Sequence, residues 1–468
     1  MKILFVIPGQ QHIYAKMHAP AQIHMGVAYL ASAIEDISDV TIIDMDAEGL
    51  DSQGYADRIS GQGFDLIGVT VTTPTFYGSS QIARITREIS PDTVIMFGGS
   101  HPTLMPYETI ANPDVDIVVS GEGEESVREI VLTLEKERDL HDIKGILFRR
   151  KTDNQVIDNG KRPQRVPEGL DNLKFPARHL FRMQSYTYPD ALYPFVAPLI
   201  TSRGCPGRCT YCNTHTLYGG KVQFRSSKNV VDEIEMLVKG GVQEIHIWDD
   251  NFATKRNRVF EICDEIQKRG IQIPIAFPAG IRADYLDRDV LMALKDMGTY
   301  SLAVGVESGD QGILDLCKKR ITLQQIEEVF NLAHECGLEI WAFFMFGLPG
   351  ETPDTIRKTI AFAHKLKPDV AKFHILKPYP GSEVYDWLNE RGLILSKDYD
   401  AFGIHGPPVH RLEALSPDEM VEWQKYAYRS FYFNCQMIIK QILRIKTINR
   451  LKLNVKAGVD LIRMNITK

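Results

Sequence analysis

The chain has 468 residues, of which 44% are hydrophobic and 24% are charged, a composition typical of a soluble globular protein with two or three domains. Its net charge of −6 argues against a nucleic-acid-binding protein, which would need a basic surface. No stretch reaches the ~18 uninterrupted apolar residues of a membrane span, and the apolar run before Pro8 does not have the pattern of a signal peptide. We therefore expect a cytoplasmic protein that binds no nucleic acid.

Residues 1–150 alternate short β-branched apolar runs with helical patterns. The expected strands are Ile3–Ile7, Val40–Ile43, Leu66–Val71, Thr93–Phe97 and Val115–Val119. A helix between the first two is indicated by the i, i+3, i+4, i+7 spacing of Val27, Leu30, Ala31 and Ile34. Continuous apolar runs are typical of parallel strands that are buried on both faces. This pattern predicts an α/β domain with a doubly wound, Rossmann-like parallel sheet.

Residues 151–195 interrupt the alternation with many prolines and are expected to form a linker. A second alternating series fills residues 196–391. Its expected strands are Leu199–Thr201, Glu244–Trp248, Ile273–Phe277, Ser301–Val306, Ile340–Phe346 and Val370–Ile375. Six such units indicate a partial (β/α)6 barrel, whose chemistry lies at the C-terminal ends of the strands. Residues 392–468 are expected to form a C-terminal helical region.

Three of the seven cysteines, Cys205, Cys209 and Cys212, lie within eight residues, directly after the first barrel strand. The total is odd and residues 1–204 contain none, which excludes a disulfide framework. Thiolates are the usual ligands of a four-iron cubane, and three of them leave the fourth iron open to a substrate, as in an open zinc site. A structural zinc site is the alternative, but zinc prefers four ligands and no partner cysteine lies nearby.

The C-x3-C-x2-C spacing after a first barrel strand resembles the radical S-adenosylmethionine (SAM) superfamily. The resemblance implies that the three cysteines bind a 4Fe–4S cluster, whose open iron chelates SAM and cleaves it to methionine and a 5′-deoxyadenosyl radical. Residues that match family positions for SAM are Tyr211 near the adenine, Asp249 and Asp250 for the methionine amino group, Arg282 for its carboxylate, Glu307 and Ser308 for the ribose, and Gly347 on the adenine side.

Each of these matches has a plain structural alternative. The Gly-Leu-Pro-Gly segment that starts at Gly347 is compatible with a simple turn, and Asp249–Asp250 with a helix cap. The second strand also lacks the Gly-Gly-Glu that names its family motif. The matches gain weight because they occur in the family's order at successive strand ends.

Two glycine-bearing segments of the first domain follow predicted strands, where open α/β sheets bind ligands. With Pro20 and Gly26 at the start of the first helix, they resemble the cobalamin-binding domain of one radical SAM subfamily, over about residues 1–390. That subfamily includes methyltransferases and the oxygen-independent magnesium-protoporphyrin monomethyl ester cyclase. The residues that the resemblance places around cobalamin are Thr70, Thr72, Gly98, Gly99, Glu122 and Gly123.

The D-x-H-x-x-G sequence that gives cobalt a histidine in cobalamin mutases is absent. His12, His18, His24 and His101 are near plausible loops but lack that context, so we expect no histidine on cobalt. His101 is equally compatible with shaping a turn with Pro102. A methylthiotransferase would carry further cysteines in its first domain, and a non-catalytic cobalamin or redox sensor would not need the SAM motifs.

The function implied by the resemblance is methyl transfer to an unactivated carbon of a small-molecule substrate, through a 5′-deoxyadenosyl radical and methylcobalamin. The alternative is a cyclase or oxidoreductase reaction without methyl transfer, as in tetrapyrrole ring closure, and the motifs do not separate the two. Either reaction needs an electron donor such as flavodoxin or ferredoxin.

Residues 425–468 contain ten Lys or Arg and one acidic residue, a net charge of +9 that leaves −15 for the rest. They also carry apolar residues at helical spacing: Ile438, Ile439, Ile442, Leu443, Ile445, Ile448, Leu451, Leu453 and Val455. A basic amphipathic helix either packs its apolar face on the protein core, which is the more usual arrangement, or lies on an anionic membrane surface. A peripheral contact at the inner membrane face therefore stays open.

Overall fold

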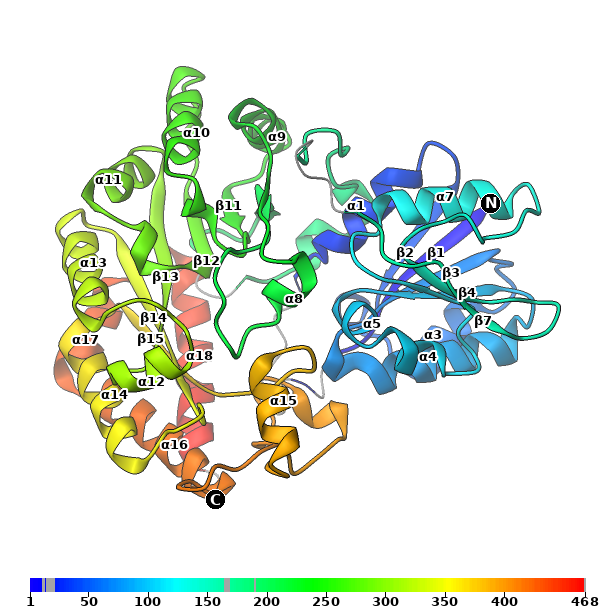
Figure 1. The fold of residues 1–468 in the computed structure, drawn as a ribbon. Coiled ribbons are helices and arrows are strands. Elements are labelled where there is room, and N and C mark those ends of the chain that lie inside the picture. Colours follow the sequence, from blue (N-terminus) through cyan, green and yellow to red (C-terminus); the bar gives the residue numbers. More distant parts are fainter. Residues whose placement is uncertain (11–12, 14–21, 164–168, 189–190, 467–468) are drawn as a thin grey trace.

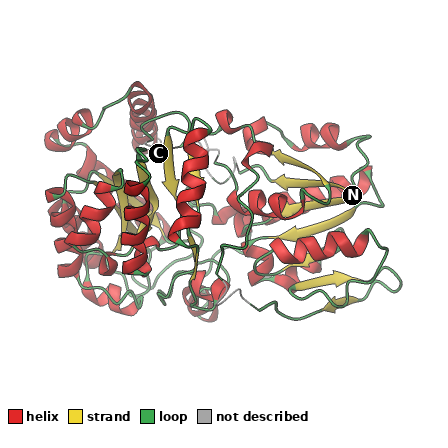
Figure 2. Cartoon of the chain, turned by 90° about the horizontal axis from the view of Figure 1, so that it is seen from above, coloured by secondary structure: helices red, strands yellow, loops and turns green. Residues whose placement is uncertain are grey.

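The computed structural model describes residues 1–10, 13, 22–163, 169–188 and 191–466, with residues 460–466 as backbone only. It shows two α/β units side by side, each with a central sheet covered by helices (Figures 1 and 2). The chain enters the N-terminal sheet first, crosses once to the second sheet, and ends in helices that pack on that second unit. The α/β class predicted from the sequence is confirmed.

The described residues of the N-terminal unit form a seven-stranded sheet in the order β2-β1-β3-β4-β5-β6-β7. Its strands are β1 (Lys2–Ile7), β2 (Asp39–Asp44), β3 (Leu66–Thr70), β4 (Val94–Gly98), β5 (Ile117–Val119), β6 (Ile146–Arg149) and β7 (Val156–Asp158). The five predicted strands are confirmed and parallel, whereas β6 and β7 are antiparallel and were not predicted. β7 is a short, largely exposed edge strand inside the expected linker, so it lacks an apolar run.

Helices cover both faces of this sheet. They are α1 (Met25–Ile34), α2 (Met45–Glu48), α3 (Ser52–Ile59), α4 (Phe76–Ile89), α5 (Ser100–Leu104), α6 (Pro106–Ile110) and α7 (Glu124–Leu134). Alternate residues of β1 enter different cores: Ile3 and Phe5 pack with α1 and α7, while Leu4 and Val6 pack with α3 and α4. This is the doubly wound arrangement, which leaves the carboxyl ends of the strands open for a ligand.

The second unit contains a six-stranded, all-parallel sheet in the order β15-β14-β13-β12-β11-β8. Its strands, counted over the described residues, are β8 (Val196–Leu199), β11 (Glu244–Ile247), β12 (Ile275–Ile281), β13 (Thr299–Glu307), β14 (Glu339–Phe346) and β15 (Val370–Ile375). Six strands therefore occur in the predicted order, although β8 begins at Val196 and shares only Leu199 with the predicted Leu199–Thr201. β15 and β8 are the two edges of the sheet, so the barrel is partial.

A small antiparallel pair was not predicted: β9 (Ser202–Arg203) joins β10 (Gln223–Phe224) just after β8. The helices around the barrel are α8 (Thr214–Tyr218), α9 (Ser227–Lys239), α10 (Arg256–Lys268), α11 (Arg288–Asp296), α12 (Gln311–Leu316), α13 (Leu323–Glu335), α14 (Pro353–Leu366), α15 (Glu383–Glu390) and α16 (Pro417–Tyr432). Two more helices, α17 (Cys435–Leu443) and α18 (Ile448–Ile466), complete the described chain.

Candidate functional site at the junction of the two units

The three motif cysteines lie on the loop between β9 and α8, at the C-terminal end of the barrel. The Gly207 backbone N–H donates to Cys205 Sγ at 3.4 Å, and the Arg282 guanidinium donates to Cys209 Sγ at 3.5 Å. An added Cβ on Gly207 would lie 3.2 Å from Arg282 Nη1 and 3.3 Å from Cys205 Sγ. Glycine therefore lets the arginine approach the sulfurs, and hydrogen bonds to cluster sulfurs are one means of tuning such a centre.

Burial raises the pKa of the Cys205 and Cys212 thiols above the usual value. The loop alone therefore favours neutral thiols, and metal binding would release the protons. Within the described ranges, no group of three His, Cys, Asp or Glu side chains converges as a single ion would require. Three thiolates are a donor set that suits a four-iron cluster, in which each would bind a different iron, whereas structural zinc takes four ligands.

The start of this loop is held by two aspartates that follow β11. Asp249 is buried, and its carboxylate accepts hydrogen bonds from the Thr201 N–H at 2.6 Å, the Thr201 hydroxyl at 2.5 Å and the Ser202 hydroxyl at 2.5 Å. Asp250 accepts the Gly204 N–H at 2.7 Å. Gly204 has φ +95°, and a Cβ there would lie 2.2 Å from the Lys221 carbonyl oxygen. Both aspartates thus position the loop, and binding of the methionine amino group stays a prediction.

A buried lysine that was not predicted connects two of the predicted SAM residues. Lys319 Nζ donates to Glu307 Oε1 at 2.8 Å and to the Tyr211 hydroxyl at 3.2 Å, and its backbone carbonyl accepts from Arg282 at 2.8 Å. Glu307 has φ +65°, a strained value for a residue with a side chain. The lysine therefore ties Tyr211, Glu307 and Arg282 into one cluster next to the cysteines.

Ser308 and Gly347 both have structural contacts within the barrel and the C-terminal region. Ser308 is fully buried; its hydroxyl pairs with Thr359 at 3.2 Å and accepts the Asp310 N–H at 3.2 Å. Its side chain therefore joins β13 to α14. Gly347 has φ +83°, and a Cβ there would lie 2.9 Å from His410 Nε2. The fold thus uses this glycine for close packing with the C-terminal region, and contacts of either residue with SAM stay predictions.

A cavity of about 340 Å³ lies between the two units, next to the cluster loop. Five of the six residues predicted around cobalamin line it: Thr70, Gly98, Gly99, Glu122 and Gly123. The sixth, Thr72, is absent from the described lining and instead pairs with Thr75 to cap a short 3-10 turn. A Cβ on Gly99, which has φ +116°, would lie 2.6 Å from the Val71 carbonyl oxygen. Close approach of the chain after β3 to the end of β4 therefore requires glycine at this position beside the cavity.

The barrel supplies the opposite wall of this cavity, through Ser202, Arg203, Tyr218, Trp248 and Asp250. Arg203, two residues before the first cysteine, reaches across the junction. It donates to Glu122 at 2.9 Å and to Glu124 at 2.5 Å, and lies over the Tyr29 ring at 5.0 Å from its centroid. The side chains of this arginine and both glutamates are largely buried, with exposures between 6% and 13%. One ion-pair cluster thus joins the cavity floor to the cluster loop.

Comparisons with known proteins agree with this geometry. The radical SAM superfamily model matches residues 199–363, and the B12 binding domain model matches residues 20–131. An uncharacterized methyltransferase of Pyrococcus horikoshii is 31% identical over 444 residues, 94% of this chain and 95% of that protein. The chain belongs to the cobalamin-dependent radical SAM enzymes.

Two further members of the family are similar over most of the chain. The anaerobic magnesium-protoporphyrin IX monomethyl ester cyclase of Rubrivivax gelatinosus is 27% identical over 444 residues, 93% of this chain and 78% of that protein. The structure of the cobalamin-dependent SAM radical enzyme OxsB, with aqua-cobalamin and SAM bound, superposes with a TM-score of 0.73 at 18% identity, over 99% of this chain and 71% of that one. That likeness confirms the fold, and the family implies a 4Fe–4S cluster, SAM and cobalamin as cofactors.

His24 is one of the four histidines considered as a ligand of cobalt, and it lines the cavity. We expected no histidine to bind cobalt. His24 Nδ1 accepts the Val27 N–H at 3.3 Å, and Nε2 lies 3.4 Å from the Thr70 hydroxyl. Burial lowers the pKa of His24 to about 4. A neutral ring with Nδ1 as acceptor carries its proton on Nε2. Both ring nitrogens thus have partners within the protein, and the absence of a histidine ligand on cobalt stays a prediction.

Of the remaining histidines of that prediction, the structure describes His101. His101 is buried, Nδ1 contacts the Thr73 hydroxyl at 3.2 Å, and the ring packs on Phe76 and Tyr399 away from the cavity lining. His101 therefore packs in the interior and does not line the cavity; its predicted role in shaping a turn with Pro102 stays a prediction. His12 and His18, like Pro20, lie outside the described residues.

Proposed function

We propose that this radical SAM enzyme transfers a methyl group to an unactivated carbon of a small-molecule substrate. The observation that carries the proposal is the wall shared by the two sites. Arg203 and Asp250 line the cavity. Asp250 also accepts the N–H of Gly204, the first residue of the cysteine loop, and Arg203 directly precedes that residue. A group held in the cavity would therefore face one held at the loop. The name of the Pyrococcus horikoshii relative supports methyl transfer as the reaction.

The chain's own residues would bind and orient the two cofactors. Thr70, Gly98, Gly99, Glu122 and Gly123 would contact cobalamin along the sheet. When bound, the iron–sulfur cluster would supply the electron that cleaves SAM, and cobalamin would carry the methyl group.

At the barrel end, the residues around Lys319 are suited to orient SAM. The Glu307 carboxylate is suited to accept ribose hydroxyls, and the Arg282 guanidinium to hold the methionine carboxylate beside Cys209. Lys319 would keep Glu307 in its strained conformation in both the free and the bound enzyme. Burial, followed by the Glu307 charge, raises the pKa of Tyr211 well above its usual value, so this ring stays neutral near the adenine.

We further propose a cytoplasmic enzyme that is reduced by a flavodoxin or ferredoxin and that contacts the inner membrane face through its C-terminal helices. Among the described residues, none of the helices is both long and apolar enough to cross a membrane. A peripheral contact would therefore depend on a surface rather than on a span.

The second candidate is a cyclase reaction without methyl transfer, supported by the Rubrivivax gelatinosus relative. Product analysis under anaerobic conditions separates the two. A methyltransferase should form S-adenosylhomocysteine and 5′-deoxyadenosine together when its substrate is present, with label from methyl-deuterated SAM in the product. Formation of 5′-deoxyadenosine without S-adenosylhomocysteine, at substrate turnover, would contradict methyl transfer and support the cyclase.

A further inference from the structure

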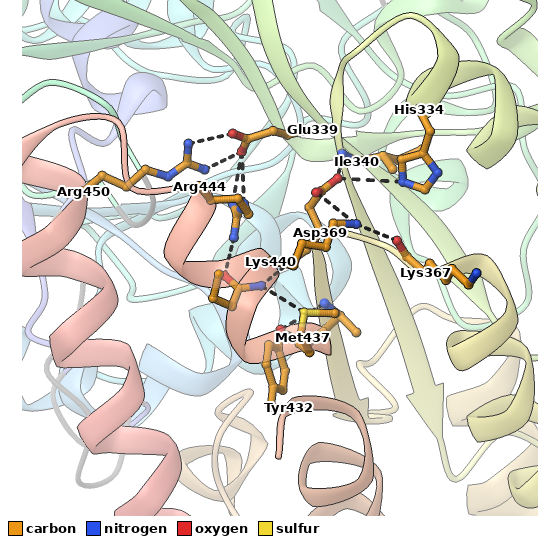
Figure 3. A network of polar contacts seen from close by, with 12 residues as sticks. His334, Glu339, Ile340, Lys367, Asp369, Tyr432, Met437, Lys440, Arg444 and Arg450 are labelled. Atoms are coloured by element: carbon orange, nitrogen blue, oxygen red, sulfur yellow. Dashed lines mark hydrogen bonds and ion pairs between the residues drawn. The ribbon is translucent and has the colours of Figure 1, made fainter. Parts of the chain in front are cut away.

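The two C-terminal helices are attached to the barrel by their polar faces. Arg444 of α17 and Arg450 of α18 both reach Glu339, the first residue of β14, as Figure 3 shows. Their side chains are only 5% and 0% exposed. Lys440 pairs with Asp369 at 3.1 Å, and Gln441 donates to the Asp369 carbonyl oxygen at 2.6 Å. Charged and amide groups, with buried Met437, thus form the contact with the sheet.

The opposite face of α17 is apolar and exposed. Ile438, Ile439, Ile442 and Leu443 are 49%, 57%, 60% and 75% exposed. They follow the i, i+1, i+4, i+5 spacing of one helical face. The usual arrangement, in which an amphipathic helix turns its apolar face to the core, is therefore reversed here.

α18 repeats the arrangement over a greater length. Ile448, Leu451, Val455 and Val459 are 75%, 44%, 59% and 41% exposed and are spaced i, i+3, i+7, i+11, which places them along one face. Arg450 lies on the other face, where Thr447 and Asn449 also bond the carbonyl oxygens of Leu192 and Ala191. We call these four residues and the four of α17 the apolar stripe.

This result corrects the more usual of the two interpretations of residues 425–468, in which the apolar face packs on the protein core. Seven of the nine apolar residues singled out in the sequence are exposed, and only Ile445 and Leu453 are partly buried. Large exposed apolar side chains also occur singly elsewhere, for example Met236, Met292 and Leu316, which is normal for a soluble surface. Four exposed apolar side chains on one face of each of two successive helices are different, because grouped apolar side chains mark interaction sites.

We infer that the apolar stripe lies against an anionic lipid bilayer, with the barrel base facing the membrane. The occupant is indicated by charge: the segment from residue 425 carries +9. Lys440, Arg444 and Arg450 form ion pairs with Asp369 and Glu339, so the attraction would come from the other cations of the segment. Lys446, Lys452 and Lys456 are exposed beside the stripe. An apolar face flanked by lysines is the pattern of helices that lie in the plane of a membrane interface. The inference concerns the surface alone and holds whichever reaction the enzyme performs.

Co-sedimentation of the full-length, cluster-loaded protein with vesicles tests this inference. We expect binding to vesicles of phosphatidylcholine mixed with phosphatidylglycerol, little binding to phosphatidylcholine alone, and weakening by salt. The variant Ile442→Ser/Leu451→Ser/Val455→Ser should bind at least about tenfold more weakly. Lys446→Gln/Lys452→Gln/Lys456→Gln should lose roughly fivefold for each lysine. The matched control, Met236→Ser/Met292→Ser/Leu316→Ser, should bind like the parent protein.

Several outcomes would overturn the inference. One is failure of the parent protein to bind anionic vesicles at low salt, and another is equal binding by the apolar triple variant. A third is self-association that this variant abolishes while no vesicle binding is seen, which would make a second copy the partner. SAM cleavage measured on the same samples keeps this test separate from the proposed function, because loss of cleavage with intact vesicle binding would count against the reaction only.

Discussion

The two ends of the barrel each contain arginine side chains buried against glutamates, but with different consequences. At the C-terminal end, Arg203 joins Glu122 and Glu124 across the junction between the units, next to the cysteine loop. At the N-terminal end, Arg444 and Arg450 meet Glu339 and attach two helices. In barrels of this kind the C-terminal end carries the chemistry and the opposite end carries stability.

The difference shows that the presence of a buried ion pair does not by itself indicate a function. Its desolvation cost roughly cancels its attraction, so what it contributes is a fixed geometry. At one end that geometry orients a cofactor loop, and at the other it turns an apolar stripe outward. Variants at each end should therefore fail in different assays.

The largest effect is expected for Cys209→Ala, at the C-terminal end. Loss of one of three thiolates should remove the four-iron chromophore and all SAM cleavage, while the fold persists because the loop lies outside both sheets. Iron content, the visible spectrum and 5′-deoxyadenosine formation measure this. Cys263→Ala, at a buried core position on α10, is the matched control and should keep a full cluster. Four irons per chain in the Cys209 variant would contradict the assignment.

The next largest effect is expected for Arg203→Met. The change removes the cation that Glu122 and Glu124 share, although Gln223 still donates to Glu122 at 2.8 Å. Breaking a buried ion pair costs about 3–5 kcal/mol. We expect cobalamin binding, followed by corrin absorption, to weaken by at least about tenfold, with an altered electron paramagnetic resonance spectrum of the reduced cluster.

Two variants calibrate the Arg203 result. Arg203→Lys keeps the charge but not both hydrogen bonds. Its affinity for cobalamin should therefore lie between those of the parent and of Arg203→Met. Arg269→Met removes an arginine from a partly exposed network on α9 and α10 and should leave both signals unchanged. If Arg203→Met changes stability alone, the ion-pair cluster is structural and does not connect the two cofactor sites.

Much of the fold could be predicted because the parallel strands are buried on both faces and therefore form continuous apolar runs. β7 and the β9–β10 pair were not predicted, because short edge strands need few apolar residues and so leave no apolar run in the sequence. The cysteines could be predicted because their chemistry depends on spacing along the chain. Lys319 could not, because a loop between α12 and α13 brings it to Glu307 and Tyr211, and no local pattern marks a residue that arrives in this way.

The direction in which a side chain points was also beyond sequence reasoning. Ser308 follows Glu307 directly, yet its hydroxyl turns to Thr359 on α14. For α17 and α18 the amphipathic pattern was visible, but the face that docks depends on Glu339 and Asp369, which lie far away in the sequence. Periodicity shows that a helix has two faces, and only the partner's chemistry decides which is buried.

At the N-terminal end, Glu339→Gln should have a moderate effect that is confined to the tail. Arg444 and Arg450 would lose their shared carboxylate, so α17 and α18 should detach more readily and trypsin should cleave faster at Lys446 and Lys452. SAM cleavage should stay within about twofold of the parent, because the site is at the other end. Glu327→Gln, which breaks a surface pair with Lys365, should change neither readout. Loss of SAM cleavage in Glu339→Gln would contradict the conclusion that the two ends of the barrel have separate roles.

The smallest effect is expected for Glu351→Gln, which tests whether every buried acid near the C-terminal end serves the cofactors. Burial raises the pKa of Glu351 to about 8, although its Oε2 accepts the N–H groups of Gly347 and Leu348. Oε1 finds no hydrogen-bond partner among the described residues. The folded protein therefore holds a proton that the unfolded chain releases above about pH 4.5.

Stability from that proton is complete below about pH 4.5 and falls as the pH rises through about 8. A glutamine accepts the same two N–H groups through its carbonyl oxygen and carries no charge. Glu351→Gln should therefore match the parent in thermal unfolding near pH 4.5 and exceed it increasingly up to about pH 8, by on the order of a few kcal/mol at most. Glu413→Gln, at an exposed position, should show no such divergence. If Glu351→Gln instead lowers the affinity for SAM at every pH, this carboxyl group serves the cofactor site. Chemical and structural roles would then have to be assigned residue by residue within the C-terminal end of the barrel.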